Sequence, residues 1–250
     1  MNQNIINNQK TILSVKHLYK SFGENQVLKD INLELNESEN MVVLGKSGSG
    51  KSVLIKCIIG LLQADSGAIE IFGKTTTQLN SMELDLVRSK IGFLFQSNAL
   101  YDSMTVRENL EFPLRRHWIH LKQEEIDKKV QQALNDVGLA NTIDMMPIEL
   151  SGGMRKRIAL ARTLILQPEI ILYDEPTTGL DPVTAREIIK LMIEIKTKYK
   201  TASIIISHDI NCVKLASDRI AIIIEGRCYT IGKYEELKNS SDKNIKQFFE

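Results

Sequence analysis

The chain has 250 residues, 43% of them hydrophobic and 25% charged, and its 32 Lys and Arg residues against 31 Asp and Glu residues leave a net charge of +1. This balance excludes a disordered chain and a collagen-like repeat, and it lacks the basic surplus typical of a nucleic-acid-binding protein. The three cysteines are far apart and do not have metal-ligand spacing, which indicates a reducing compartment.

The start of the chain shows no targeting signal. Its first ten residues are rich in Asn and lack the apolar core of a signal peptide, so we expect the protein to stay in the cytosol. The longest apolar stretch, 53–62, is broken by Lys56 and is shorter than the ~20 residues that cross a bilayer. Any membrane association is therefore expected to depend on a partner.

Short strands and a glycine-rich loop are predicted in the first hundred residues. Segments 12–18 and 27–35 have the pattern of an antiparallel flank. The apolar run 41–44 leads into a glycine cluster and then into a helix with apolar residues from 53 to 61, which predicts a unit of buried strand, loop and helix. Further strands are expected at 68–72 and 91–95, with a helix at 81–89 between them.

The rest of the chain begins with a helical pattern and then alternates between predicted strands and helices. Residues 103–161 are mostly helical in pattern, with a helix stop at Gly138 and interruptions at Pro113 and Pro147. Alternation then resumes, with strands expected at 170–173, 202–207 and 220–224 and helices at 182–198 and 210–216. This order predicts an α/β protein with a mainly parallel sheet covered by helices. We expect a single domain, 1–250, with an inserted helical subdomain at about 100–165.

The glycine cluster matches the pattern Gly-x4-Gly-Lys-Ser between a predicted strand and a predicted helix. Glycines allow backbone N–H groups to curl around phosphate oxygens, and the helix start adds the positive end of its dipole. Lys51 is expected to reach the outer phosphates, and the Ser52 hydroxyl is expected to ligate Mg²⁺. The alternative is a flexible loop that matches by chance. The predicted phosphate-binding residues are Gly45, Lys46, Ser47, Gly48, Ser49, Gly50, Lys51 and Ser52.

Two acids, Asp174 and Glu175, follow the predicted strand 170–173. Ligands collect at the carboxyl ends of strands in open α/β sheets. Asp174 is expected to hold the metal or its water, and Glu175 to orient or deprotonate an attacking water. A simple strand-end turn before Pro176 is the alternative, but the phosphate loop in the same chain favours the catalytic interpretation.

Three further positions are candidates. Ser151 is a predicted N-cap, and the two glycines after it leave the first N–H groups of the helix accessible. Residues 151–153 are therefore either an ordinary helix cap or a second anion site, which would complete the nucleotide site of another subunit. Gln96 and His208 each follow a predicted strand. At the end of such a strand, the imidazole of His208 could reach a γ-phosphate. Asp209 is expected to cap the next helix.

From about residue 12 onwards the chain resembles the ATP-binding subunits of ABC transporters. The resemblance rests on the order of the motifs: the phosphate loop, Gln96, Leu-Ser-Gly-Gly at 150–153, Asp174-Glu175, 179–181 and His208. It implies a P-loop nucleotide-binding domain with ATPase activity, with ATP and Mg²⁺ as cofactors and with Gln96 linking the Mg²⁺ region to the permease. It also implies that Phe22 stacks on adenine, for which ordinary packing is the alternative. Ser151, Gly153 and Asp181 would meet the nucleotide or the surface of a second copy.

Within that superfamily, the chain most resembles the ATPases of Mla/MCE-type phospholipid transport systems. The similar stretches are 95–106, 108–109, 112–115, 146–147 and 245–249. This resemblance implies a homodimer that sandwiches two ATP molecules, lies on the cytoplasmic face of the inner membrane and drives a membrane permease, with an MCE-domain lipid-binding protein as a further partner. A cargo of amino acids, ions or lipoproteins is the alternative, as is an ABC ATPase that acts as a scaffold outside transport.

Overall fold

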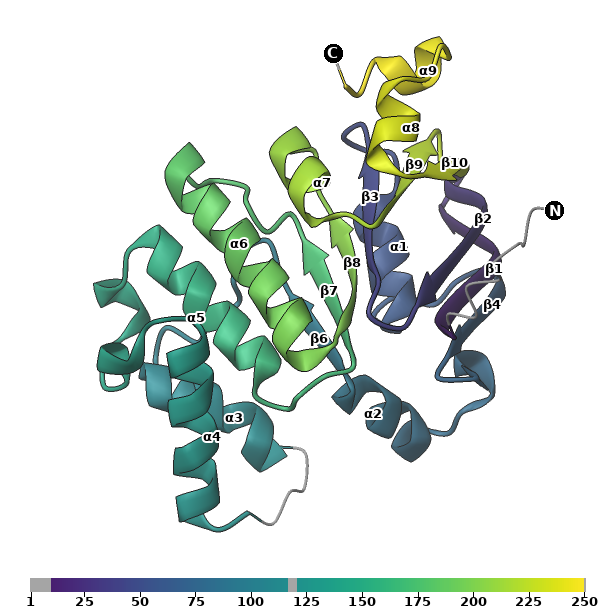
Figure 1. Cartoon of the computed structure of the whole chain (residues 1–250). Helices are drawn as coiled ribbons and strands as arrows, with labels where there is room; N and C mark the ends of the chain where they lie inside the picture. The colour runs from purple at the N-terminus through teal and green to yellow at the C-terminus, as the bar shows by residue number, and fades with distance from the viewer. Residues whose placement is uncertain (1–9, 117–120, 250) are drawn as a thin grey trace, which may run out of the picture.

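The structure, a computed structural model, describes residues 10–116 and 121–249 (Figure 1). Its main sheet has six strands, in the spatial order β10 (Arg227–Gly232), β9 (Arg219–Ile224), β3 (Asn40–Gly45), β8 (Ala202–Ile206), β7 (Ile170–Asp174) and β6 (Ile91–Leu94). All neighbours in this sheet are parallel except β9 and β10. The predicted, mainly parallel sheet is therefore confirmed.

A second sheet forms the predicted antiparallel flank. Its order is β2 (Asn25–Asn36), β1 (Thr11–Phe22), β4 (Ser66–Ile71) and β5 (Lys74–Thr75). The first two strands are longer than predicted, because register shifts interrupt their alternation without ending them. At one such shift His17 and Asp30 have left-handed backbones, with φ of 49° and 62°, and their side chains meet at 2.7 Å. A period of two cannot be followed in the sequence across such bulges.

The core lies on both faces of the main sheet. One face is covered by α1 (Lys51–Ile58), α2 (Ser81–Ser89) and the antiparallel sheet; the other by α5 (Gly152–Leu164), α6 (Pro182–Tyr199) and α7 (Ile210–Ala216). In β3, Val42 and Leu44 pack in one cluster, whereas Met41 and Val43 pack in the other. Because both faces are buried, the central strands are continuous apolar runs.

The middle of the chain is helical, as predicted. It contains α3 (Val106–Arg116), α4 (Gln123–Asp136), η2 (Ala140–Thr142), η3 (Pro147–Glu149) and α5. Gly138, with φ of 70°, follows the end of α4 as expected. The expected interruption at Pro113 is wrong, since this residue lies inside α3. The neighbouring Leu110 and Leu114 are buried in the core, and this packing holds the helix together across the proline.

The elements predicted from the sequence end at residue 224, but the structure continues with β10, α8 (Tyr234–Lys238) and α9 (Lys243–Lys246). The rings of Tyr234 and Phe249 meet edge to face at 5.6 Å, and the Tyr229 hydroxyl donates to Asp242 at 2.6 Å. A short helix, η1 (Thr76–Gln78), was also not predicted. The helices are too short for a periodic pattern to reveal them, and β10, with the sequence RCYTIG, is only partly buried and has no continuous apolar run.

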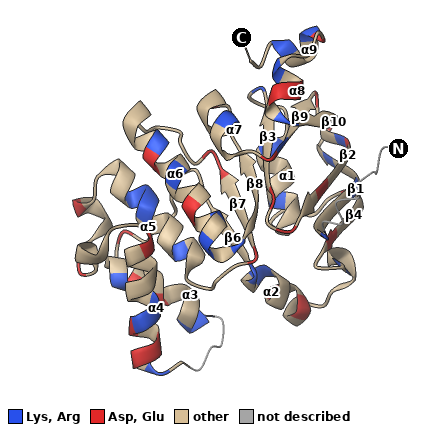
Figure 2. Cartoon of the chain, viewed as in Figure 1, with Lys and Arg blue, Asp and Glu red and all other residues tan. Residues whose placement is uncertain are grey.

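Charges of both signs are interleaved over the helices in Figure 2, as their nearly equal numbers suggest. Within 10–116 and 121–249, no helix is both long enough and apolar enough to cross a membrane.

Candidate functional site

The phosphate loop connects β3 to α1 and folds around its own lysine. The Lys51 ammonium donates to the carbonyl oxygens of Gly45 at 2.8 Å and Lys46 at 3.0 Å. Burial lowers the pKa of Lys51, while the carboxylates of Glu175 and Asp174 act in the opposite direction. The lysine is thus held at the loop with its charge close to two acids.

Two glycines give the loop its shape. Gly48 and Gly50 have φ of 77° and 100°, which L side chains rarely adopt. A Cβ at position 50 would lie 2.8 Å from Leu28 Cδ2 and 3.0 Å from the Val27 carbonyl oxygen. Gly50 is also the N-cap of α1 and supplies no side-chain cap, so the first N–H groups of the helix are left for another acceptor. The site is therefore a cradle for an anion.

Oxygen ligands lie beside this cradle. The Ser52 hydroxyl donates to Asp174 Oδ1 at 3.1 Å, and Asp174 is buried at the end of β7. Burial raises the pKa of Asp174, the bond from Ser52 opposes this rise, and the charge of Glu175 adds to it. No group of three or more His, Cys, Asp or Glu side chains suited to a metal occurs in the described residues. One hydroxyl and one carboxylate fit Mg²⁺, which is commonly held by one or two carboxylates together with phosphates and water.

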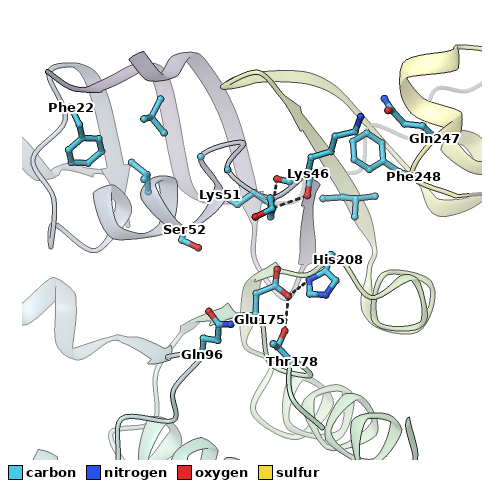
Figure 3. A pocket seen from close by; sticks show the side chains of 17 residues that line it. Phe22, Lys46, Lys51, Ser52, Gln96, Glu175, Thr178, His208, Gln247 and Phe248 are labelled. Carbon is cyan, nitrogen blue, oxygen red and sulfur yellow. Dashed lines mark hydrogen bonds and ion pairs between the residues drawn. The ribbon is translucent and has the colours of Figure 1, made fainter. Parts of the chain in front are cut away.

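Glu175 is fixed by two side chains. Its Oε2 lies 2.8 Å from His208 Nδ1 and accepts a hydrogen bond from the Thr178 hydroxyl at 3.3 Å (Figure 3). Its backbone is left-handed, with φ of 51°, and its N–H donates to the carbonyl of Ile206 at 3.0 Å. A carboxylate held in this way can orient a water molecule or accept its proton.

A cavity of about 870 Å³ unites most of the predicted residues. Its lining includes Gln96, Glu175 and His208, which face the phosphate loop across the cavity (Figure 3). Phe22 stands at one side; the residue is 48% exposed, and the Lys20 ammonium lies 5.4 Å from the centre of its ring. The predicted residues in the lining are Phe22, Gly45, Lys46, Ser47, Gly48, Gly50, Lys51, Ser52, Gln96, Glu175 and His208.

The remaining loop residue, Ser49, has a buried hydroxyl without a hydrogen-bond partner among the described residues, and it lines a smaller cavity of about 350 Å³ that also borders the end of β9.

The residues expected to serve a second copy lie outside this lining. Ser151 accepts from the Met154 N–H at 3.2 Å, so its predicted role as an N-cap is confirmed. Asp181 caps α6, and hydrogen bonds from Thr184 lower the pKa of its carboxyl. A Cβ on Gly153 would lie 2.7 Å from Thr184 Cγ2, so the starts of α5 and α6 are neighbours. Their contact with a second copy stays a prediction.

Several lining residues were not predicted from the sequence. Thr178 lies in the Pro-Thr-Thr-Gly turn after Glu175, and this turn was the available signal. Gln247 and Phe248 come from the chain's last turn and reach the same cavity opposite Phe22 (Figure 3). The stretch 245–249 carries only part of the resemblance, and nothing in it predicts a place in the nucleotide site, because only the folded chain brings residue 248 to the phosphate loop.

The fold and this geometry define a phosphate-loop nucleotide hydrolase. A family model described as "ABC transporter" matches residues 28–178. The chain belongs to the ABC transporter family, as an ATP-hydrolysing subunit of a transporter. The predicted fold class and ATPase activity are thereby confirmed.

Three curated relatives have similar identity but names with different cargoes. The probable ribonucleotide transport ATP-binding protein mkl of Mycobacterium leprae is 39% identical over 94% of this chain and 68% of its own length. The methionine import ATP-binding protein MetN of Clostridium tetani is 35% identical over 95% and 80%. The intermembrane phospholipid transport system ATP-binding protein MlaF of Haemophilus influenzae is 36% identical over 99% and 91%. The lipid-transport branch is therefore one of several that match similarly well.

Solved structures match as well. A dimeric post-hydrolysis state of the ATP-binding cassette MJ0796, bound to ADP and Pi, superimposes with a TM-score of 0.80 and 33% identity, over 89% of this chain and 98% of that one.

Proposed function

We propose that ATP binds with Mg²⁺ between the phosphate loop and Glu175. Lys51 and the loop N–H groups would bind the phosphates, and Phe22 would pack against the adenine. Ser52 and Asp174 would hold Mg²⁺, with Gln96 reaching it from the opposite wall. When bound, the metal would neutralise charge on the outer phosphates. The hydroxyl and carboxylate 3.1 Å apart support this assignment.

The catalytic proposal centres on Glu175. This carboxylate would orient the attacking water and accept its proton, and His208 would approach the outer phosphate. The observation that carries the proposal is the position of Glu175 Oε2, which is bound to both His208 and Thr178 and faces the phosphate loop across the cavity.

The working unit in this proposal is a pair of copies. Ser151 and Gly153 stand at an exposed helix start outside the cavity lining of their own chain, and Asp181 stands at the neighbouring helix start. A helix start with free N–H groups is suited to the phosphates of another copy. The dimer reported for the similar cassette supports this arrangement. Closing and opening of the pair would drive a membrane permease.

For the cargo we propose phospholipid, carried through a permease with an MCE-domain partner at the cytoplasmic face of the inner membrane. MlaF supports this choice because the match extends over 99% of this chain and 91% of MlaF, against 68% of the mkl protein. Ribonucleotides and methionine are the competing cargoes, from the names of mkl and MetN. The family match disfavours a scaffold outside transport.

Purification of the tagged chain from solubilised membranes tests this function. We expect a polytopic permease and an MCE-domain protein to co-purify, and we expect the complex in liposomes to move labelled phospholipid only when Mg²⁺ and ATP are present. A Lys51→Ala complex is the matched control and should move none. ATP-driven uptake of methionine or ribonucleotide without lipid movement would contradict the proposed cargo, and an assembly without any membrane subunit would contradict transport.

A further inference from the structure

Lys156 is a buried cation that none of the assignments above uses. It lies in α5, one turn after the helix start at Ser151, and the residue is only 2% exposed. An ammonium group taken out of water is stabilised only where protein acceptors replace its hydration. The contacts of this group therefore indicate what holds it in place.

The Lys156 ammonium donates to the backbone carbonyl of Gln96 at 3.1 Å. This is the one hydrogen bond that the structure gives Lys156 Nζ within the described ranges. Burial lowers the pKa of Lys156 to about 8, and the carboxylate of Asp174 acts in the opposite direction. Because β6 and β7 are parallel neighbours, Gln96 and Asp174 both lie at the carboxyl edge of the sheet, and Lys156 approaches this edge from α5.

The loop that starts at Gln96 depends on such outside support. Asn98 and Ala99 both have left-handed backbones, with φ of 65° and 52°, and the Asn98 side-chain oxygen is buried with no hydrogen-bond partner among the described residues. Farther along, the buried Asn109 fixes the loop by accepting from the Tyr101 N–H and donating to the Tyr101 carbonyl. The loop is thus anchored by Lys156 at its start and by Asn109 at its end.

We propose that Lys156 is a positioning residue for ATP hydrolysis: by binding the Gln96 carbonyl it sets the place of the Gln96 side chain in the nucleotide cavity. The same bond ties Gln96 to the helix that begins at Ser151, so a displacement of α5 also displaces Gln96. This inference rests on the proposed role of Gln96 in the nucleotide site.

Lys156→Met tests the proposal, because methionine keeps much of the side-chain length and volume but removes the charge and the donor. We expect kcat for ATP to fall about tenfold or more, since small displacements of a reacting geometry are costly. KM for ATP should stay within about twofold, and the thermal midpoint should stay the same or rise, since a buried charge is removed. Backbone amides of 97–101 should exchange hydrogen faster. Lys156→Arg should restore part of kcat.

Two further variants make the test specific. Lys128→Met, at an exposed position of α4, should leave every one of these measurements unchanged. The double variant Gln96→Ala, Lys156→Met should turn over no more slowly than Gln96→Ala alone, because Lys156 acts through that side chain.

Three outcomes would overturn the inference: full kcat in Lys156→Met, additive losses in the double variant, or a loss of kcat matched by a lower thermal midpoint and a higher KM. A wild-type chain that does not hydrolyse ATP would instead contradict the proposed function.

Discussion

The Ser52 hydroxyl and the Asp174 carboxylate lie 3.1 Å apart although 122 residues separate them in the chain. Ser52 stands at the start of α1 and Asp174 at the end of β7, and the order of the sheet brings the two together because β3 and β7 both pair with β8. The oxygen atoms suited to Mg²⁺ are thus positioned by the most deeply buried strands of the protein.

Asp174→Asn should stabilise the protein while disabling it. Burial raises the pKa of Asp174, so the folded state holds its proton to higher pH than the unfolded state does, and stability is lost as pH rises through this range. The amide of the Asp174→Asn variant carries no charge, so this loss of stability at high pH does not occur in the variant. Without Mg²⁺ and nucleotide, the thermal midpoint of the variant at pH 7 should exceed that of wild type, and the difference should shrink toward pH 4. Mg²⁺-dependent turnover should fall by about 10²-fold.

Scanning fluorimetry between pH 4 and pH 8 checks this prediction, with the exposed Asp102→Asn as the control that should not shift. A lower midpoint for Asp174→Asn at pH 7 would show that the charged carboxylate stabilises the fold.

Glu175→Gln should separate binding from hydrolysis. The amide can keep hydrogen bonds to His208 and Thr178 but cannot accept a proton from water. We expect turnover to fall by about 10² to 10⁴-fold with ATP affinity retained. Light scattering with Mg²⁺ and ATP should detect a dimer that ADP does not support. Normal phosphate release by this variant would remove Glu175 from its proposed role.

Thr178→Val should reduce turnover through Glu175. The Thr178 hydroxyl donates to Glu175 Oε2 at 3.3 Å, and valine has a similar shape without the donor. Loss of one hydrogen bond worth ~1 kcal/mol corresponds to about a fivefold lower kcat. Thr178→Ser keeps the hydroxyl and should keep most of the activity. Equal rates for the valine and serine variants, measured by steady-state phosphate release, would contradict a positioning role.

Gly50→Ala should cost more stability than Gly48→Ala. Both glycines have positive φ, but a Cβ would clash with Leu28 and Val27 only at position 50, whereas position 48 faces open space. We expect about 1–2 kcal/mol for the backbone strain alone at position 48, and a larger loss at position 50. Urea unfolding measures both losses, and a Gly48→Ala protein less stable than Gly50→Ala would contradict this view of the loop.

Continuous apolar runs made the central fold predictable from the sequence. The runs 41–44 and 170–173 are continuous and apolar, which is typical of strands buried on both faces. The bulges near His17 and the proline inside α3 were harder to foresee, because partner strands and core packing decide them.

Contiguous motifs made most of the site predictable, because the phosphate loop and the acid pair each act as a unit of sequence. Phe248 and Lys156 contribute through contacts that only the folded chain creates. The Lys156 bond joins residues 60 positions apart, and a separation of that size leaves no local pattern to detect.

The two-sided packing of β3 restricts how this protein can change its length. Inserting one residue before Gly45 would either turn Val42 and Leu44 to the face now occupied by Met41 and Val43, or leave the strand in place and move the phosphate loop relative to Asp174. Between residues 41 and 51 the spacing is therefore fixed, and insertions and deletions should accumulate elsewhere, at surface connections such as the turn between β4 and β5.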